Sequence, residues 1–101
     1  ELESAEQHIE LLNTLVELKT AQFELKSDNL AGAKVALSGT AARLEALQPL
    51  VESVDATLAG NMLTRLDLIL NGMDNKPASS LVDLEMLFGN LQSVETLLFG
   101  E

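Results

Sequence analysis

Several residue types are rare or missing in this chain, and each absence removes a class of structure or chemistry. The sequence contains no cysteine, which excludes disulfide frameworks, thiol catalysis and thiolate metal sites. It has no tryptophan or tyrosine and only three phenylalanines among 101 residues, too few aromatic residues for most β-sandwiches. Secreted and cytosolic proteins can both lack cysteine, so the localisation stays open.

Basic residues are also scarce. The chain has 6 lysines and arginines against 16 acids, a net charge of −10, and the acids are spread over both halves of the sequence. Such a surface repels phosphate backbones and anionic lipids, so we expect no nucleic-acid partner. No apolar run approaches the roughly 20 residues of a membrane span, and we expect no membrane insertion of this segment. Because the sequence begins with Glu1 rather than methionine, we expect it to be a segment of a longer protein.

What is abundant is leucine. Hydrophobic residues make up 47% of the chain, and their spacing is helical over most of its length. The pattern predicts one all-α domain over residues 1–101, with helices at about 2–26, 30–47, 50–70 and 80–99.

The first predicted helix carries the strongest pattern. A seven-residue row begins at its second residue and consists of Leu2, Ile9, Val16 and Phe23. We assign five further leucines to the same apolar arc: Leu11, Leu12, Leu15, Leu18 and Leu25. The glutamates one position after each member of the row are expected on the opposite, solvated side. An arc this wide suits a helix packed against two neighbours in a bundle.

Turn signals separate the remaining helices. Residues 27–29 (Ser-Asp-Asn) offer N-cap side chains for a second helix, and Pro49 suits the first turn of a third. Gly60 is a possible break within that third helix. Residues 71–78 form the clearest loop, and Ser80 three residues before an acid resembles a capping box.

These elements predict an antiparallel four-helix bundle made of two consecutive αα-hairpins. Sliding the sequence by 47 residues aligns leucines and alanines of the two halves, as expected of two hairpins of one design. The alternative is that any two leucine-rich hairpins of similar length align this well.

The sequence has few residues for catalysis. His8 is the only histidine, and position 5, three residues earlier, is alanine, so a di-metal site of the Glu-x-x-His kind is excluded. A Ser-His-acid arrangement has only His8 to use, near the start of a helix. Phosphate-binding glycine loops are missing as well. We therefore predict that the chain is not an enzyme and that it has no cofactor or metal.

What remains is an excess of apolar residues over one small core. The last helix carries a candidate contact surface made of Met86, Phe88, Leu97, Leu98 and Phe99. The alternative is that this helix lies in the centre of the bundle and is buried on most sides. We expect a non-enzymatic helical protein–protein interaction or scaffold module that self-associates or binds another protein. The alternative function is an extracytoplasmic helical sensor domain of a membrane receptor.

Overall fold

The computed structural model describes the backbone of residues 2–100 and the side chains of residues 5–100, and it contains no strand in that part of the chain. Its five helices are α1 (Leu2–Lys26), α2 (Leu30–Ala36), α3 (Thr40–Glu52), α4 (Ala56–Gly72) and α5 (Pro77–Phe99). The prediction of an all-α chain is confirmed. The predicted number of helices, four, is not observed.

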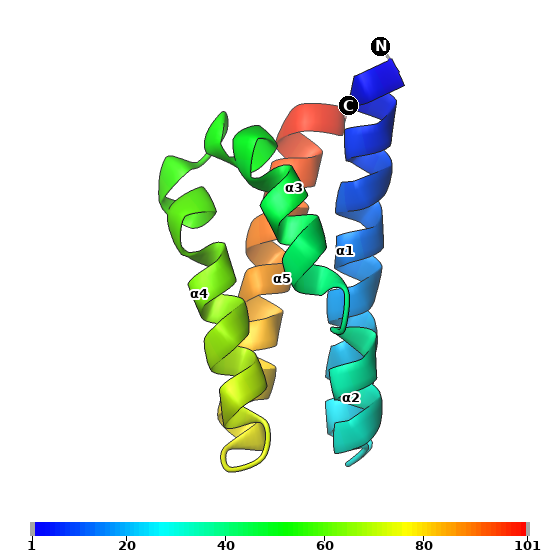
Figure 1. Cartoon of the computed structure of the whole chain (residues 1–101), viewed down its shortest axis with the longest axis vertical. Coiled ribbons are helices and arrows are strands. Elements are labelled where there is room, and N and C mark those ends of the chain that lie inside the picture. Colours follow the sequence, from blue (N-terminus) through cyan, green and yellow to red (C-terminus); the bar gives the residue numbers. More distant parts are fainter. Residues whose placement is uncertain (1, 101) are drawn as a thin grey trace.

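The helices lie alongside one another in a bundle about 41 Å long (Figure 1). α1 runs from one end of the bundle to the other. α2 and then α3 run in the opposite direction, α4 runs in the direction of α1, and α5 runs opposite to α1. α1 packs against α2, α3 and α5, while α4 packs against α3 and α5. The start of α1 and the end of α5 therefore meet at the same end of the molecule.

The turn between α1 and α2 forms as the sequence predicts. Asp28 has a φ of 60°, a left-handed conformation that short polar residues tolerate. Asn29 is the N-cap of α2, and its Oδ1 accepts a hydrogen bond of 3.0 Å from the backbone N–H of Gly32.

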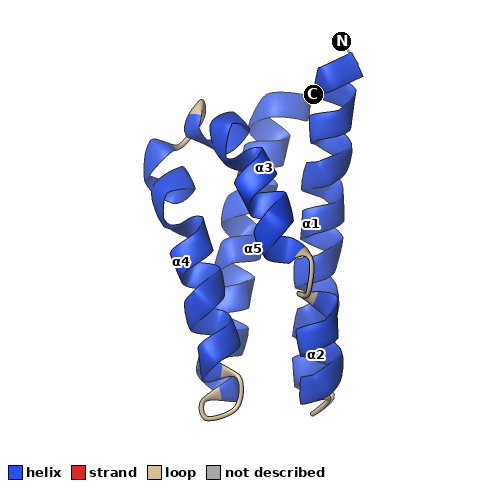
Figure 2. Cartoon of the chain, viewed as in Figure 1, coloured by secondary structure: helices blue, strands red, loops and turns tan. Residues whose placement is uncertain are grey.

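The second predicted helix is interrupted, and its continuous range of 30–47 is wrong. Residues 37–39 form a turn between α2 and α3 (Figure 2). Ser38 and Gly39 have low helix propensity, and the turn lets Leu37 and Thr40 both point into the core, where they are buried.

The next two boundaries also differ from the prediction. α3 continues through Pro49 to Glu52, since a helix can pass a proline at the loss of one hydrogen bond. α4 begins instead after Asp55, whose Oδ1 caps the N–H of Leu58 at 3.0 Å. The possible break at Gly60 does not occur, because α4 is continuous there.

α5 begins earlier than predicted, at Pro77, whose missing N–H has no helical partner to lose at that position. Ser80 is therefore inside the helix rather than in a capping box. It is buried, and its hydroxyl donates a hydrogen bond of 2.8 Å to the carbonyl of Ile69, which joins α5 to α4.

α1 has two apolar faces instead of the single arc that we assigned. Positions two apart on an α-helix are separated by roughly 200°, so the row of Leu11, Leu18 and Leu25 lies almost opposite the row of Ile9, Val16 and Phe23. The first row is buried, together with Leu15, Thr14, Ala21 and Gln22. The second faces solvent. Leu2 and Glu3 also belong to the predicted rows but lie outside the described side chains.

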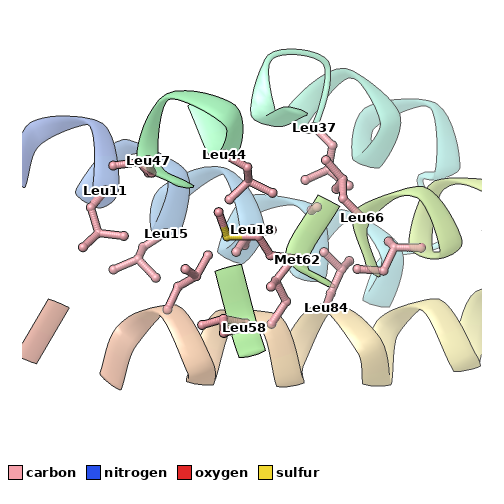
Figure 3. Close-up of a cluster of buried hydrophobic side chains, with 14 of the residues drawn as sticks. Leu11, Leu15, Leu18, Leu37, Leu44, Leu47, Leu58, Met62, Leu66 and Leu84 are labelled. Atoms are coloured by element: carbon pink, nitrogen blue, oxygen red, sulfur yellow. The ribbon is translucent and has the colours of Figure 1, made fainter. Parts of the chain in front are cut away.

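Leucine is the commonest residue in the core, with alanine, valine, methionine and isoleucine beside it. Figure 3 shows Leu18 of α1 close to Leu44 of α3 and Met62 of α4, with Leu84 of α5 completing the layer. These four side chains are fully buried. The core thus joins α1, α3, α4 and α5.

Two buried side-chain atoms lack a hydrogen-bond partner among the described residues: Nε2 of Gln22 and Oδ1 of Asn61. Gln22 is 3% exposed, and its Nε2 has no hydrogen bond to any residue that the structure describes. Since a buried, unpaired amide N–H is costly, Gln22→Met is expected to raise the free energy of unfolding by about 1–2 kcal/mol. Urea denaturation measures this change. The matched control is Gln92→Met at an exposed position of α5, and an equal gain there would contradict the explanation.

Candidate interaction surface

The His8 side chain contacts two residues of α5 within the bundle. Its Nε2 lies 2.8 Å from Oε2 of Glu95, and its ring stacks on Phe99 with centroids 4.1 Å apart. These contacts hold the end of α5 against the beginning of α1. No three His, Cys, Asp or Glu side chains of the described residues come together as a metal site requires.

Two glutamates of α1 also have structural partners. Nε of Arg43 donates a hydrogen bond of 2.8 Å to Oε2 of Glu17, and its Nη1 donates to Glu10. The hydroxyl of Thr40 donates to the other oxygen of Glu17 at 2.7 Å. The expectation of a fully solvated glutamate row is therefore wrong for these two residues. The hydrogen bonds from Arg43 to Glu17 and then to Glu10 raise the pKa of its guanidinium above the ordinary value of arginine.

The structure does not bring the five predicted interface residues onto one surface. Met86 and Leu97 are exposed, whereas the other three, Phe88, Leu98 and Phe99, are partly buried and pack against the core. Met86 and Phe88 lie roughly 160° apart around α5, on opposite edges of that helix. The alternative of a central α5 does not hold either, because one side of the helix is exposed.

A larger exposed apolar surface lies on α1. Its members share the outward side of the helix and follow one another at spacings of three, four and seven residues; we call Ile9, Leu12, Val16 and Phe23 the α1 stripe. Their exposed fractions run from 42% at Leu12 to 66% at Phe23. The seven-residue row of the sequence contains Ile9, Val16 and Phe23, but we assigned them, with Leu12, to a single arc packed against neighbouring helices.

Charged residues flank the stripe differently on its two edges. Toward α2 and α3 lie Glu17 and Glu24, and toward α5 lie Lys19 and Lys26. Nζ of Lys19 sits 4.9 Å from the centroid of the Phe88 ring, so the lysine side chain leans over the seam between α1 and α5. These charges are engaged within the bundle: Glu17 with Arg43 and Thr40, Glu24 with Asn29, and Lys26 with Glu85 at 3.8 Å.

The other exposed apolar residues form one smaller group on α4 and α5 and two single positions. Leu68, Val82 and Met86 lie on α4 and α5, and an open hollow there is lined by Leu68 and Met86 with Arg65 and Asp83. Val35 on α2 and Leu97 near the end of α5 are further exposed positions. Isolated exposed apolar residues are normal on protein surfaces. The α1 stripe differs because it continues along one helix face.

Comparison with protein-family models, curated proteins and solved structures found no match for this chain. Among the residues that the structure describes, no helix is both long enough and apolar enough to cross a bilayer.

Proposed function

We propose that this chain is a non-enzymatic helical protein–protein interaction module that self-associates. The observation that carries the proposal is the α1 stripe, which leaves Ile9, Val16 and Phe23 more than half exposed on one helix face. Burying apolar surface contributes about 25 cal/mol per Å², so covering such a row with a partner is favourable.

The row also has the spacing that helix partners use. Positions 9, 12 and 16 follow the three- and four-residue steps of a coiled-coil seam; the next seam position is Lys19, and Phe23 continues the row seven residues after Val16. None of these side chains is needed by the monomer core, because α1 fills that core with the opposite row. A helix with an apolar row on each side suits a role in joining its own bundle to another helix.

We further propose that the fold is an antiparallel four-helix bundle of two hairpins in which α2 and α3 together replace the second helix. The path of the chain in Figure 1 supports this, since α2 and α3 follow one another along α1. A bundle of this kind presents α1 on a rigid support, which favours specific association.

Light scattering behind a sizing column tests the proposed self-association. Across a concentration series we expect the molar mass to rise from that of one chain, 10.9 kDa, toward twice that value. Because α1 offers a short contact, we expect this transition in the micromolar range. A chain that remains monomeric at millimolar concentration would contradict the proposal.

The second candidate is the extracytoplasmic sensor domain of a membrane receptor. It is favoured by one observation: α1 begins and α5 ends at the same end of the bundle, where His8 contacts Glu95 and Phe99 (Figure 1). If membrane-spanning segments precede and follow a domain that lies on one side of the membrane, both ends of the domain must face that membrane. The sequence flanking residues 1–101 in the full gene tests it, since a sensor of this kind needs an apolar span of about 20 residues near each end.

A further inference from the structure

We propose that the groove between α4 and α5 is a docking site for an acidic amphipathic helix of another protein. The residues that define this α4–α5 groove are Arg65, Leu68, Lys76, Asp83 and Met86. It consists of two adjoining open hollows of about 230 and 460 Å³, which share Leu68 and Asp83. α4 and α1 lie on opposite sides of the bundle (Figure 1), so docking in this groove is independent of self-association through the α1 stripe.

Four of the six basic residues are engaged within the fold, and the two that are not both line this groove. The engaged residues and their contacts are Lys26 with Glu85, Lys34 with Asp74, Arg43 with Glu10 and Glu17, and Lys19 with the Phe88 ring. Arg65 and Lys76 form no ion pair with any residue that the structure describes. Free positive charge therefore gathers in one groove of a chain whose net charge is −10, and it favours an anionic occupant there.

The acid in this groove does not neutralise both bases. Asp83 is the single acid among the described residues that line it, and it forms no ion pair with Arg65. The lining thus has two positive charges and one negative charge. Carboxylates of a partner complement the two bases, whereas a basic partner would meet both of them.

Leu68 and Met86 supply the apolar part of the site. They are 61% and 52% exposed, and they line the same hollow from α4 and from α5. A helix packs well in the groove between two neighbouring helices, and its apolar anchors recur at steps of three and four residues. Covering these two side chains supplies more of the affinity than the exposed charge pairs, which set the orientation.

The positions of the two bases predict the spacing of the acids in the partner helix. Lys76 directly precedes α5, and Met86, which shares a hollow with Arg65, follows ten residues later, about 15 Å along the helix. Residues 11 apart lie on one face of a helix, roughly 16 Å from each other. Acids at i and i+11 can therefore meet both bases, with apolar residues at i+4 and i+7 between them.

A second copy of this chain does not offer such a helix. The pairs of acids that lie 11 residues apart in the sequence are Glu6 and Glu17, Glu17 and Asp28, and Asp74 and Glu85. Glu17 belongs to the first two pairs and is held by Arg43. In the third pair Asp74 is held by Lys34. Each pair thus contains an acid that is already engaged within the bundle, which favours a helix from a different protein.

A synthetic peptide tests this proposal. The probe is a fluorescently labelled, alanine-based helical peptide with Glu at i and i+11 and Leu at i+4 and i+7, and fluorescence anisotropy measures its binding to the full chain. We expect a dissociation constant below about 1 mM, and about tenfold weaker binding of a matched peptide with Gln in place of both glutamates. Absence of binding at 1 mM, or equal binding of the two peptides, would overturn the proposal.

A charge swap tests the two bases directly. The double variant R65E/K76E is expected to bind the Glu peptide at least tenfold more weakly and to bind a peptide with Lys at both positions instead. Asp83→Asn should bind the Glu peptide about two- to threefold more tightly, because it removes the acid of the groove. The matched control is K19E/K26E, which changes the net charge equally on α1 and should alter the affinity by less than about twofold. Equal losses in the two double variants would overturn the site.

Leu68→Gln tests the apolar contact and separates the possible occupants. It should weaken binding of the Glu peptide about tenfold with an unchanged thermal melt, and Val35→Gln at a 72% exposed position of α2 should alter neither. If Leu68→Gln instead weakens self-association in light scattering, a second copy occupies the groove and the proposal is overturned. A chain that binds the peptide but is always monomeric would overturn only the proposed self-association.

Discussion

Replacing Leu18 by alanine is expected to lower the free energy of unfolding by about 3–5 kcal/mol. Leu18 is 0% exposed and lies in the middle of α1, where Figure 3 places it close to Leu44 and Met62. The substitution removes three carbon atoms from a site enclosed by several helices. The surrounding helices cannot collapse fully into the space, so a cavity term adds to the lost transfer free energy.

Urea denaturation followed by circular dichroism measures this loss. Because domains of this size are stable by only about 5–15 kcal/mol, the variant should unfold at a much lower urea concentration. The control is Leu68→Ala on α4, where the leucine is 61% exposed and the expected change is below about 0.5 kcal/mol. Equal losses in the two variants would contradict the placement of the core on the Leu18 side of α1.

Replacing Arg43 by methionine is expected to cost about 1–2 kcal/mol of stability, after allowance for the partial exposure of its side chain. The guanidinium joins α3 to α1 through Glu17 and Glu10. Methionine keeps much of the apolar stem but leaves both carboxylates without this partner. The Glu17 side chain is only 21% exposed, so water replaces the lost hydrogen bonds incompletely.

A double-mutant cycle with Glu17→Gln isolates the interaction energy of this pair. The single substitutions should each destabilise the fold, and the double variant should lose less than their sum. Arg65→Met is the control, since Arg65 forms no ion pair with any residue that the structure describes. Full additivity in the cycle would show that the contact between Arg43 and Glu17 contributes nothing to stability.

Local signals in the sequence predicted several elements correctly. α1 has the predicted range of 2–26, because its leucines recur over the full helix and Asp28 and Asn29 supply the turn that ends it. The end of α5 at Phe99 is also as predicted. In each case the periodic apolar residues and the capping side chains lie within the element or a few residues from it.

Other features depend on contacts that are distant in the sequence. The interruption at residues 37–39 is stabilised when Thr40 donates to Glu17, 23 residues earlier. Ser80 lies inside α5, where its hydroxyl donates a hydrogen bond to the carbonyl of Ile69 on α4. The capping box predicted from the sequence considers only residues 80–83 and does not include this contact. Helix propensity at these positions is a weak preference that tertiary contacts can override.

The candidate surface shows the same division. The sequence contains the heptad row of Ile9, Val16 and Phe23 in full, and it also contains the row of Leu11, Leu18 and Leu25. Helix geometry alone separates these rows by roughly 200°, but it does not state which of them is buried. Only the packing of α2, α3 and α5 against one side of α1 leaves the other side exposed.

The sequence by itself therefore determined the helical class, the extent of α1 and the acidic character of the surface, since periodicity, capping and charge are local or additive properties. The tertiary structure decided which apolar row becomes the core, where the second helix breaks, and which glutamates are neutralised by Arg43. Each of these depends on which segments meet in space, because a side chain is buried or paired only by residues that other helices bring to it.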